Sequence, residues 1–216
     1  RMRALSSFLT LSISFLLSAC AGFHLAGSRP LPPALQAVYS DVIAPSPVSE
    51  PTVEVALRSQ IQRRGGTVLD VGANLGMISI ALLRHGYFER AVAFEPAPDN
   101  LRLLERNVVQ NGLGDRVTRC PIALSSAPGE LELELSDYNS GDHRLRHHAQ
   151  PGAWHEDRRP TVRVPVRRLD DALPELGPAS ADVRLVWLDI QGHEGHFFRG
   201  ARRALVLILK GVARSE

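Results

Sequence analysis

The sequence predicts an α/β fold in which a parallel sheet is flanked by helices. Short apolar runs alternate with amphipathic helical patterns, and a glycine-rich turn at residues 70–76 follows the first apolar run. Strand–helix–strand repeats of this kind are typical of parallel sheets with right-handed crossovers. The predicted strands are Thr67–Val71, Arg90–Phe94, Val117–Leu124 and Val183–Ile190, and the predicted helices are Met77–Arg84, Pro98–Gln110, Leu169–Leu176 and Phe197–Leu209.

The composition is that of one globular domain. The 216 residues are 44% hydrophobic and 22% charged, with a formal net charge of +2. This small positive excess does not indicate nucleic-acid binding, so we expect no nucleic-acid partner. The two cysteines, Cys20 and Cys120, lie far apart, which argues against a disulfide framework or a cysteine-rich metal site. We expect Cys120 to be a buried structural side chain.

The first 52 residues are expected to lie outside the folded domain. Residues 1–26 contain the apolar stretch Phe8–Leu17 followed by Cys20, which resembles a bacterial lipoprotein signal. The alternative is an upstream extension whose resemblance is accidental. Residues 27–52 are rich in proline and serine and are typical of a linker. We therefore expect the domain to span residues 53–216, with a short helix over Thr52–Gln62 at its start.

Two alternating segments predict a second pair of strands. Residues 130–135 alternate glutamate with leucine, and Thr161–Arg167 alternates in the same way. Alternation is typical of half-buried strands, and opposite charges across the pair would support their pairing. Pro165 predicts that its strand lies at a sheet edge. Between the segments, Ser136–Pro160 is a long polar stretch, which is typical of a functional loop.

The glycine-rich turn is the strongest indication of a ligand. Open parallel sheets bind ligands at the carboxyl ends of their strands, where the strand order reverses. Gly72 and Gly76 permit tight turns and close approach to a ligand. Glu95 ends the second predicted strand and can accept hydrogen bonds from both ribose hydroxyls of an adenosine. The predicted cofactor-binding residues are Asp70, Gly72, Ala73, Asn74, Gly76 and Glu95.

The spacing of the turn also bears on the type of nucleotide. NAD and FAD sites favour Gly-x-Gly-x-x-Gly, with the pyrophosphate at the helix N-terminus. Here the pattern is Asp-x-Gly-x-x-x-Gly, starting at Asp70. The missing central glycine disfavours a pyrophosphate, so an NAD-dependent oxidoreductase is the weaker interpretation.

The order and spacing of several motifs resemble the FkbM-type methyltransferases over about residues 50–216. These motifs are Val68–Gly76, Phe94–Pro96, Asn107–Gly112, Ser140–Arg144, Leu169–Asp171 and Leu188–Glu194. The resemblance implies a class I methyltransferase fold, S-adenosylmethionine as methyl donor, and a hydroxyl of a sugar, polyketide or similar small molecule as acceptor. Gln191 departs from the family's commoner Asp-Val-Glu-Gly. Family members continue beyond Glu216, so we expect the domain to be C-terminally truncated, with a fifth strand starting near Gly211.

The turn after the fourth predicted strand holds the main catalytic candidates. Asp189 and His193 are the first choices for the base that removes the hydroxyl proton, and Glu194 is next. Asp142 and His143, on the long loop, could close over the substrate. The alternatives are that Asp189 caps a turn or binds the methionine portion of the donor, and that His193 caps the next helix.

Two other groups of side chains, histidines and arginines, are not expected to bind a ligand. The histidines of the long loop match no closed zinc pattern, so we expect no metal. A group of arginines is expected to form a solvated face paired with the glutamates. These residues are His143, His147, His148 and His155, and Arg158, Arg159, Arg163, Arg167 and Arg168.

The expected location is cytoplasmic, because S-adenosylmethionine is a cytoplasmic donor. We expect membrane association only through the N-terminal segment. The alternative is a lipid-anchored binding protein that uses a methyltransferase-like fold and is attached through Cys20.

Overall fold

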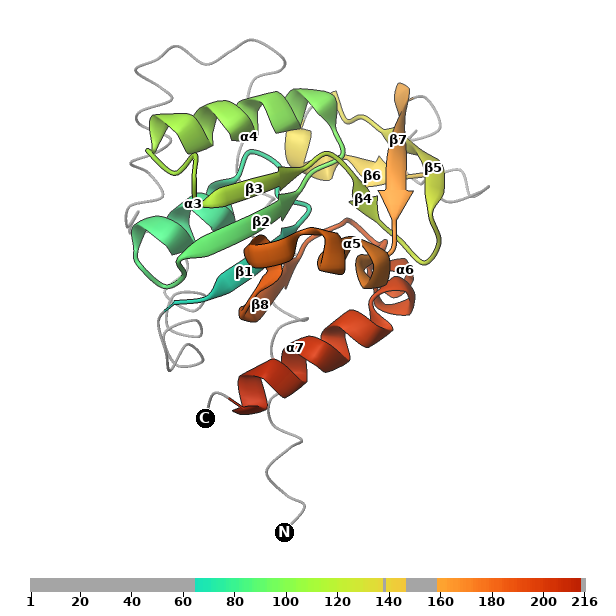
Figure 1. Cartoon of the computed structure of the whole chain (residues 1–216). Coiled ribbons are helices and arrows are strands. Elements are labelled where there is room, and N and C mark those ends of the chain that lie inside the picture. The colour runs from blue at the N-terminus through green and yellow to red at the C-terminus, as the bar shows by residue number, and fades with distance from the viewer. Residues whose placement is uncertain (1–64, 138, 147–158, 215–216) are drawn as a thin grey trace.

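The computed structural model describes residues 65–137, 139–146 and 159–214, which form two four-stranded sheets with packed helices (Figure 1). The α/β fold predicted from the alternation of strands and helices is confirmed. The predicted leader, linker, Cys20 and the helix over Thr52–Gln62 lie outside the described residues. Within those residues, no helix combines the length and the apolar character that crossing a membrane requires.

The first sheet consists of four parallel strands: β1 (Thr67–Val71), β2 (Arg90–Phe94), β3 (Val117–Cys120) and β8 (Val183–Leu188). Their order in the sheet is β3-β2-β1-β8. The chain order reverses at β1, because β2 lies on one side of it and β8 on the other. Open α/β sheets bind ligands at such a reversal, beyond the carboxyl ends of the strands.

Helices cover both faces of this sheet. α3 (Met77–Arg84) and α4 (Pro98–Gln110) pack on one face, and α5 (Leu169–Glu175), α6 (Glu194–Gly200) and α7 (Arg202–Arg214) pack on the other (Figure 1). Successive strand residues point to opposite faces. Val68 and Ala93 therefore join the core beneath α3 and α4, whereas Leu69 and Val92 join the core on the other side.

The second sheet is smaller and mixed. Its strands are β4 (Ala123–Leu124), β5 (Gly129–Glu134), β6 (Arg144–Leu145) and β7 (Thr161–Arg167), in the order β4-β7-β5-β6. A small apolar core of its own includes Leu133, Leu145 and Val164. The short 3-10 turn η2 (Ser140–Asp142) lies between β5 and β6, and η4 (Gly177–Ser180) follows α5. Part of the stretch predicted as a long loop therefore forms η2 and β6.

The predicted pairing of the two alternating segments is confirmed. β5 and β7 pair antiparallel, with Glu132 opposite Arg163. The prediction that Pro165 marks an edge strand is wrong, because β7 lies between β4 and β5. β4 pairs only with Val166 and Arg167, so it joins β7 just after the proline. The missing N–H of Pro165 therefore leaves no gap in that ladder.

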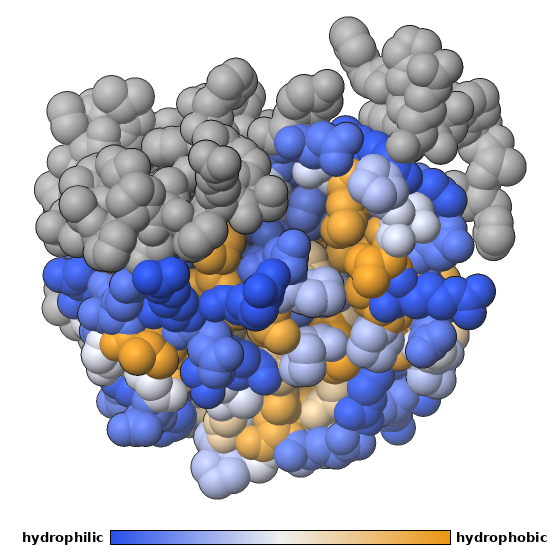
Figure 2. Space-filling model, turned by 90° about the horizontal axis from the view of Figure 1, so that it is seen from above, coloured by the Kyte–Doolittle hydropathy of each residue, from blue (hydrophilic) through white to orange (hydrophobic). Residues whose placement is uncertain are grey.

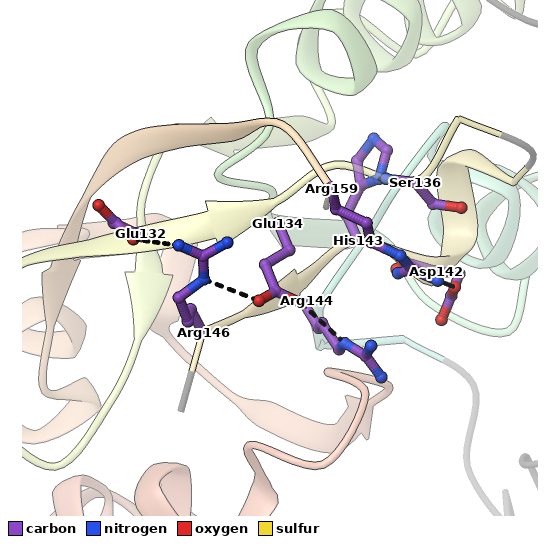
Figure 3. Close-up of polar contacts among 8 residues, drawn as sticks. All are labelled: Glu132, Glu134, Ser136, Asp142, His143, Arg144, Arg146 and Arg159. Atoms are coloured by element: carbon purple, nitrogen blue, oxygen red, sulfur yellow. Dashed lines mark hydrogen bonds and ion pairs between the residues drawn. The ribbon is translucent and has the colours of Figure 1, made fainter. Parts of the chain in front are cut away.

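The charge partners of β5 differ from the prediction. Across the β5–β7 pair, Arg163 approaches Glu130 only to 3.9 Å, and both side chains are exposed. The closer partners come from the β6 side. Glu134 lies between Arg144, at 3.2 Å, and Arg146, at 2.8 Å (Figure 3). The partly buried ion pairs therefore bind β5 to the β6 segment rather than to β7.

The third predicted strand, Val117–Leu124, is two strands. Ile122 N donates to Cys120 O at 2.8 Å, so the chain turns sharply there. Pro121 has no N–H with which to continue a ladder. The residues after this turn join the second sheet as β4. Cys120 is buried as predicted, and burial raises the pKa of its thiol to about 11, which makes it unreactive.

The predicted helix Phe197–Leu209 is also divided, into α6 and α7. The end of α6 packs against the backbone beyond β4: a Cβ on Gly200 would lie only 2.0 Å from Ser125 O. The chain changes direction there, at Ala201, before α7 begins. α7 then continues to Arg214, so the expected start of a strand near Gly211 is wrong. The fourth strand likewise ends at Leu188, two residues earlier than predicted.

The described surface seen from above is a mixture of polar side chains and small apolar patches (Figure 2). The large apolar side chains exposed among the described residues include Val206 and Leu207 of α7. Single exposed apolar residues are common on protein surfaces, so these do not by themselves mark a functional site.

Candidate active site

A pocket lies beyond the carboxyl ends of the parallel strands, between them and the second sheet. One wall is formed by the residues that follow β1, β2 and β8, and the other by β4, β5, β6 and η2. Lining residues on the first wall include Gly72, Asn74, Glu95, Pro96, Asp189 and Gln191. Those on the second include Leu124, Leu133, Ser140, Gly141, His143, Arg144 and Leu145. The pocket therefore combines the ligand-binding edge of the first sheet with side chains supplied by the second.

The backbone conformation directly after β1 requires a glycine at position 72, which lines the pocket. Its φ is +86°, and a Cβ there would lie 2.0 Å from Asp189 O, so the chain after β1 touches the chain after β8. The N–H groups of Gly72 and Ala73 both donate to Phe94 O, each at 3.0 Å. These contacts bring the ends of three neighbouring strands together within one turn.

Asp70, Ala73 and Gly76 support the turn but do not line the pocket. Asp70 accepts hydrogen bonds from Ser79 N, at 3.1 Å, and Ser79 Oγ, at 2.6 Å, and so ties the turn to α3. Burial raises the pKa of Asp70 to about 6. Ala73 is part of the apolar core, and Gly76, with φ +82°, precedes α3 and packs on Leu104. The contacts of Asp70 therefore orient the turn relative to α3.

Glu95 lines the pocket and is held by backbone amides. Its Oε2 accepts from Asn74 N at 2.7 Å, and its Oε1 accepts from Ala97 N at 2.8 Å. Only 5% of the residue is exposed, and burial raises the pKa of its carboxyl to about 7. A carboxylate can accept about four hydrogen bonds, so the oxygens retain capacity for ligand hydroxyls.

Asn74 adopts a left-handed conformation, with φ +49°, beside this carboxylate. Its side-chain Oδ1 is buried and has no hydrogen-bond partner among the residues that the structure describes. A buried acceptor of this kind normally has a partner. Its place in the pocket lining makes it suited to accept a hydrogen bond from a bound ligand.

Of the four catalytic candidates, Asp189, His193 and His143 line the pocket and Glu194 does not. Asp189 Oδ1 accepts from Gln191 Nε2 at 2.9 Å. His193 is only 2% exposed, with its Nε2 3.0 Å from Ser125 Oγ and its ring stacked on His196. It stands at the start of α6, but its side chain makes no capping hydrogen bond. Glu194 instead accepts from the nearby Gly192 N at 3.2 Å.

The protonation of His143 follows from its backbone contact. Its Nδ1 lies 3.0 Å from Ser136 N, and a backbone N–H can only donate, so Nδ1 is the acceptor. Burial lowers the pKa of this imidazole, which favours the neutral form with its proton on Nε2. His143 therefore offers an N–H donor. Its neighbour Asp142 does not line the pocket and is held by Arg159 at 2.5 Å (Figure 3).

Several lining residues were not among the predicted site residues. Asn100 is buried in the first turn of α4, and Ser140, Gly141 and Arg144 come from the segment that contains η2. The polar Asn100 on an otherwise apolar helix face was a signal that the sequence offered. The position of Arg144 follows from the pairing of β5 with β6, which the sequence did not predict.

The predicted histidine and arginine clusters lie only partly in the described part of the chain. No group of three potential metal ligands occurs there. His147, His148, His155 and Arg158 lie outside it. The other four arginines of the predicted basic cluster each contact an acidic residue: Arg159 with Asp142, Arg163 with Glu130, Arg167 with Glu175 and Arg168 with Asp171.

A family model described as the methyltransferase FkbM domain matches residues 70–209. The chain belongs to the FkbM methyltransferase family. The match covers the glycine-rich turn, Glu95, the second sheet and most of α7, so it includes both walls of the pocket. The resemblance seen in the sequence motifs is thereby confirmed.

The chain is also similar to individual methyltransferases. The chain is 28% identical to "Methyltransferase 1" of Beauveria bassiana over 144 residues, covering 62% of this chain and 57% of the relative. It is 27% identical to "Methyltransferase sdnD" of Sordaria araneosa over 153 residues, covering 62% and 59%. The chain thus spans less than two thirds of the length of these curated relatives. A crystal structure of methyltransferase FkbM from Methylobacillus flagellatus is similar with a TM-score of 0.44 and 21% identity, over 68% of this chain and 32% of that one.

Proposed function

We propose that this protein is an S-adenosylmethionine-dependent methyltransferase that methylates a hydroxyl of a small molecule, of the sugar or secondary-metabolite type. The observation that carries the proposal is the position of Glu95. Its buried carboxylate lines the pocket next to the Gly72 turn, at the reversal point of a parallel sheet. Membership of the FkbM family supplies the reaction class.

The first wall of the pocket suits the nucleoside of the donor. Glu95 would accept hydrogen bonds from the ribose hydroxyls, while Asn74 Oδ1 and the backbone of the turn contact the rest of the ligand. The turn lacks the central glycine that pyrophosphate cofactors favour. These features support a nucleoside without a pyrophosphate.

The second wall would hold the acceptor. S-adenosylmethionine supplies an electrophilic methyl group, so the protein has to align the acceptor oxygen and receive its proton. The carboxylate of Asp189 lines the pocket, and Gln191 orients it by a hydrogen bond. We assign to Asp189 the role of the base that receives the hydroxyl proton. His143 would donate its Nε2–H to the acceptor, because its Nδ1 is occupied by Ser136 N. His193 would shape the floor between the two walls.

Calorimetric titration of the chain with S-adenosylhomocysteine, S-adenosylmethionine and NAD tests this proposal. We expect the two sulfur nucleosides to bind and NAD not to bind. Glu95→Gln should weaken S-adenosylhomocysteine by about tenfold or more, because the hydroxyls lose an ionised acceptor. Glu194→Gln is the matched control and should bind like the wild type, because Glu194 lies outside the pocket lining. Binding of NAD alone would overturn the proposal in favour of an oxidoreductase.

We also propose that the catalytic unit occupies residues 53–216 and acts in the cytoplasm. Limited proteolysis with S-adenosylhomocysteine present should leave a protected fragment that starts close to residue 53. Uptake of labelled palmitate that depends on Cys20 would contradict the cytoplasmic location and favour a lipid-anchored protein.

A further inference from the structure

Asn100 is a buried polar residue of the pocket lining that contacts the second wall. It lies in the first turn of α4 and is 3% exposed. Its Nδ2 donates to Ser140 O of η2 at 3.0 Å. Ala97, which directly precedes α4, donates its N–H to Glu95 Oε1 at 2.8 Å. The first turn of α4 therefore connects the ribose-side acid, through Ala97 N, to the backbone of η2, through the Asn100 amide.

A second contact joins the same two parts of the site. Asn74, whose N–H donates to Glu95 Oε2, packs directly against Gly141. A Cβ on Gly141 would lie 3.3 Å from Asn74 Nδ2, so the backbone of η2 lies close over this side chain. The turn itself is held by Gly141 N, which donates to Asn139 Oδ1 at 2.9 Å. Ser140 and Gly141 thus lie next to Asn100 and Asn74, which belong to the two segments whose backbone N–H groups donate to the Glu95 carboxylate.

The residues directly after η2 line the acceptor side of the pocket. His143 and Arg144 follow Asp142 without any intervening residue, and β6 begins at Arg144. A displacement of η2 would therefore displace the His143 imidazole. On its outer side η2 is held by Arg159, whose guanidinium contacts Asp142 and does not reach Glu95.

We propose that Asn100 is a positioning residue that couples cofactor binding to the placement of the acceptor wall. The proposal rests on the proposed function. A ligand that binds Glu95 favours its ionised form, and an ionised acceptor strengthens the hydrogen bond from Ala97 N at the start of α4. Asn100, in the first turn of the same helix, then holds Ser140, and with it His143 and Arg144, in place. Cofactor binding therefore stabilises the acceptor site.

Hydrogen exchange of the full chain, with and without saturating S-adenosylhomocysteine, tests this coupling. In the wild type we expect the ligand to slow exchange over residues 139–146 by about tenfold, the size of one charge-assisted hydrogen bond. In Asn100→Ala and Asn100→Asp this protection should fall to less than about twofold. Residues 72–76 should remain protected in both variants, which shows that the ligand is bound and the protein folded.

Asn107→Ala is the matched control. Asn107 lies on the same helix and its Nδ2 donates to Leu75 O at 2.9 Å, so the variant loses the same kind of hydrogen bond without contact to η2. It should keep the protection of residues 139–146. Wild-type levels of this protection in both Asn100 variants, or protection confined to residues 72–76 in the wild type, would overturn the coupling. Absence of any S-adenosylhomocysteine binding to the wild type would instead overturn the proposed function.

Discussion

The two sheets hold the two walls of the pocket by different means. In the parallel sheet the wall is set by backbone contacts: Gly72 touches Asp189 O, and two N–H groups share Phe94 O. In the second sheet the wall is set by side chains, since Glu134 joins Arg144 to Arg146 and Arg159 holds Asp142 (Figure 3).

This difference separates what is fixed from what can vary. A backbone contact at a positive φ accepts almost no other residue, so the wall that we propose for the donor tolerates few substitutions. Ion pairs between partly exposed side chains are weaker and more easily exchanged. They suit the wall that we propose for the acceptor, since its shape can change between family members.

Gly72→Ala should have the largest effect. The new Cβ would meet Asp189 O, and the positive φ adds strain, so we expect a loss of about 3 kcal/mol or more in the free energy of unfolding. Urea unfolding measures it. Gly114→Ala is the matched control, because a Cβ there has nothing within 4 Å, and it should change stability very little. A Gly72→Ala variant as stable as Gly114→Ala would show that backbone contact does not set this wall.

Glu134→Gln should have an intermediate effect. The change leaves Arg144 and Arg146 close together without their shared anion, and we expect a loss of about 1–2 kcal/mol. These arginines hold the pKa of the Glu134 carboxyl below its usual value. The stabilisation is therefore present above that usual value and is lost as the pH falls through the lowered one. Glu132→Gln should cost less in the same urea titration, because the Glu132 carboxylate is more exposed and the structure describes one ion pair for it, with Arg146. Equal losses in the two variants would contradict the special position of Glu134.

Ligand affinity at the first wall should depend on pH through the ionisation of Glu95. Burial raises the pKa of its carboxyl from 4.5 to about 7. Without ligand, its contribution to stability is complete below pH 4.5 and is lost as the pH rises through about 7. Ribose hydroxyls need the ionised form, so S-adenosylhomocysteine affinity should increase about tenfold between about pH 6 and 8. Calorimetry at several pH values measures this, and Glu95→Gln should flatten the profile. A profile that rises toward low pH would exclude the carboxylate as the ribose acceptor.

Arg163→Ala should have the smallest effect. Its contact with Glu130 is 3.9 Å long between two exposed side chains, so we expect less than about 0.5 kcal/mol in thermal or urea unfolding. The position opposite Glu132 in the β-ladder does not change this expectation, because the Glu132 carboxylate pairs with Arg146 instead. A loss as large as that of Glu134→Gln would show that the β5–β7 charges, rather than those of β6, stabilise the second sheet.

The sequence predicted the parallel sheet well because its signals are local. The apolar runs gave β1 and β2 with the observed bounds, and Gly76 and Pro98 marked the starts of α3 and α4. It predicted the second sheet less well because its order depends on non-local contacts. A periodicity of two shows that β5 and β7 are strands but not that β4 also pairs with β7.

The candidate site shows the same division. The alignment of Gly72, Asn74 and Glu95 at one sheet edge follows from strand order, and the sequence predicted these residues together. Arg144 could not be predicted in the same way, because its place in the pocket depends on the pairing of β6 with β5. Asp70 shows that an acid in a glycine-rich turn can also hold the helix after it, here through Ser79.

The contact between Gly200 and Ser125 O limits which segments of this chain can be exchanged for those of a related protein. The chain after β4 and the end of α6 contact each other through main-chain atoms, although β5, β6 and β7 lie between them in the sequence. A chimera that imports β4 to β7 from another family member, in order to change acceptor choice, would carry a foreign partner for this glycine. Such a graft should therefore also include α6 from the same donor protein.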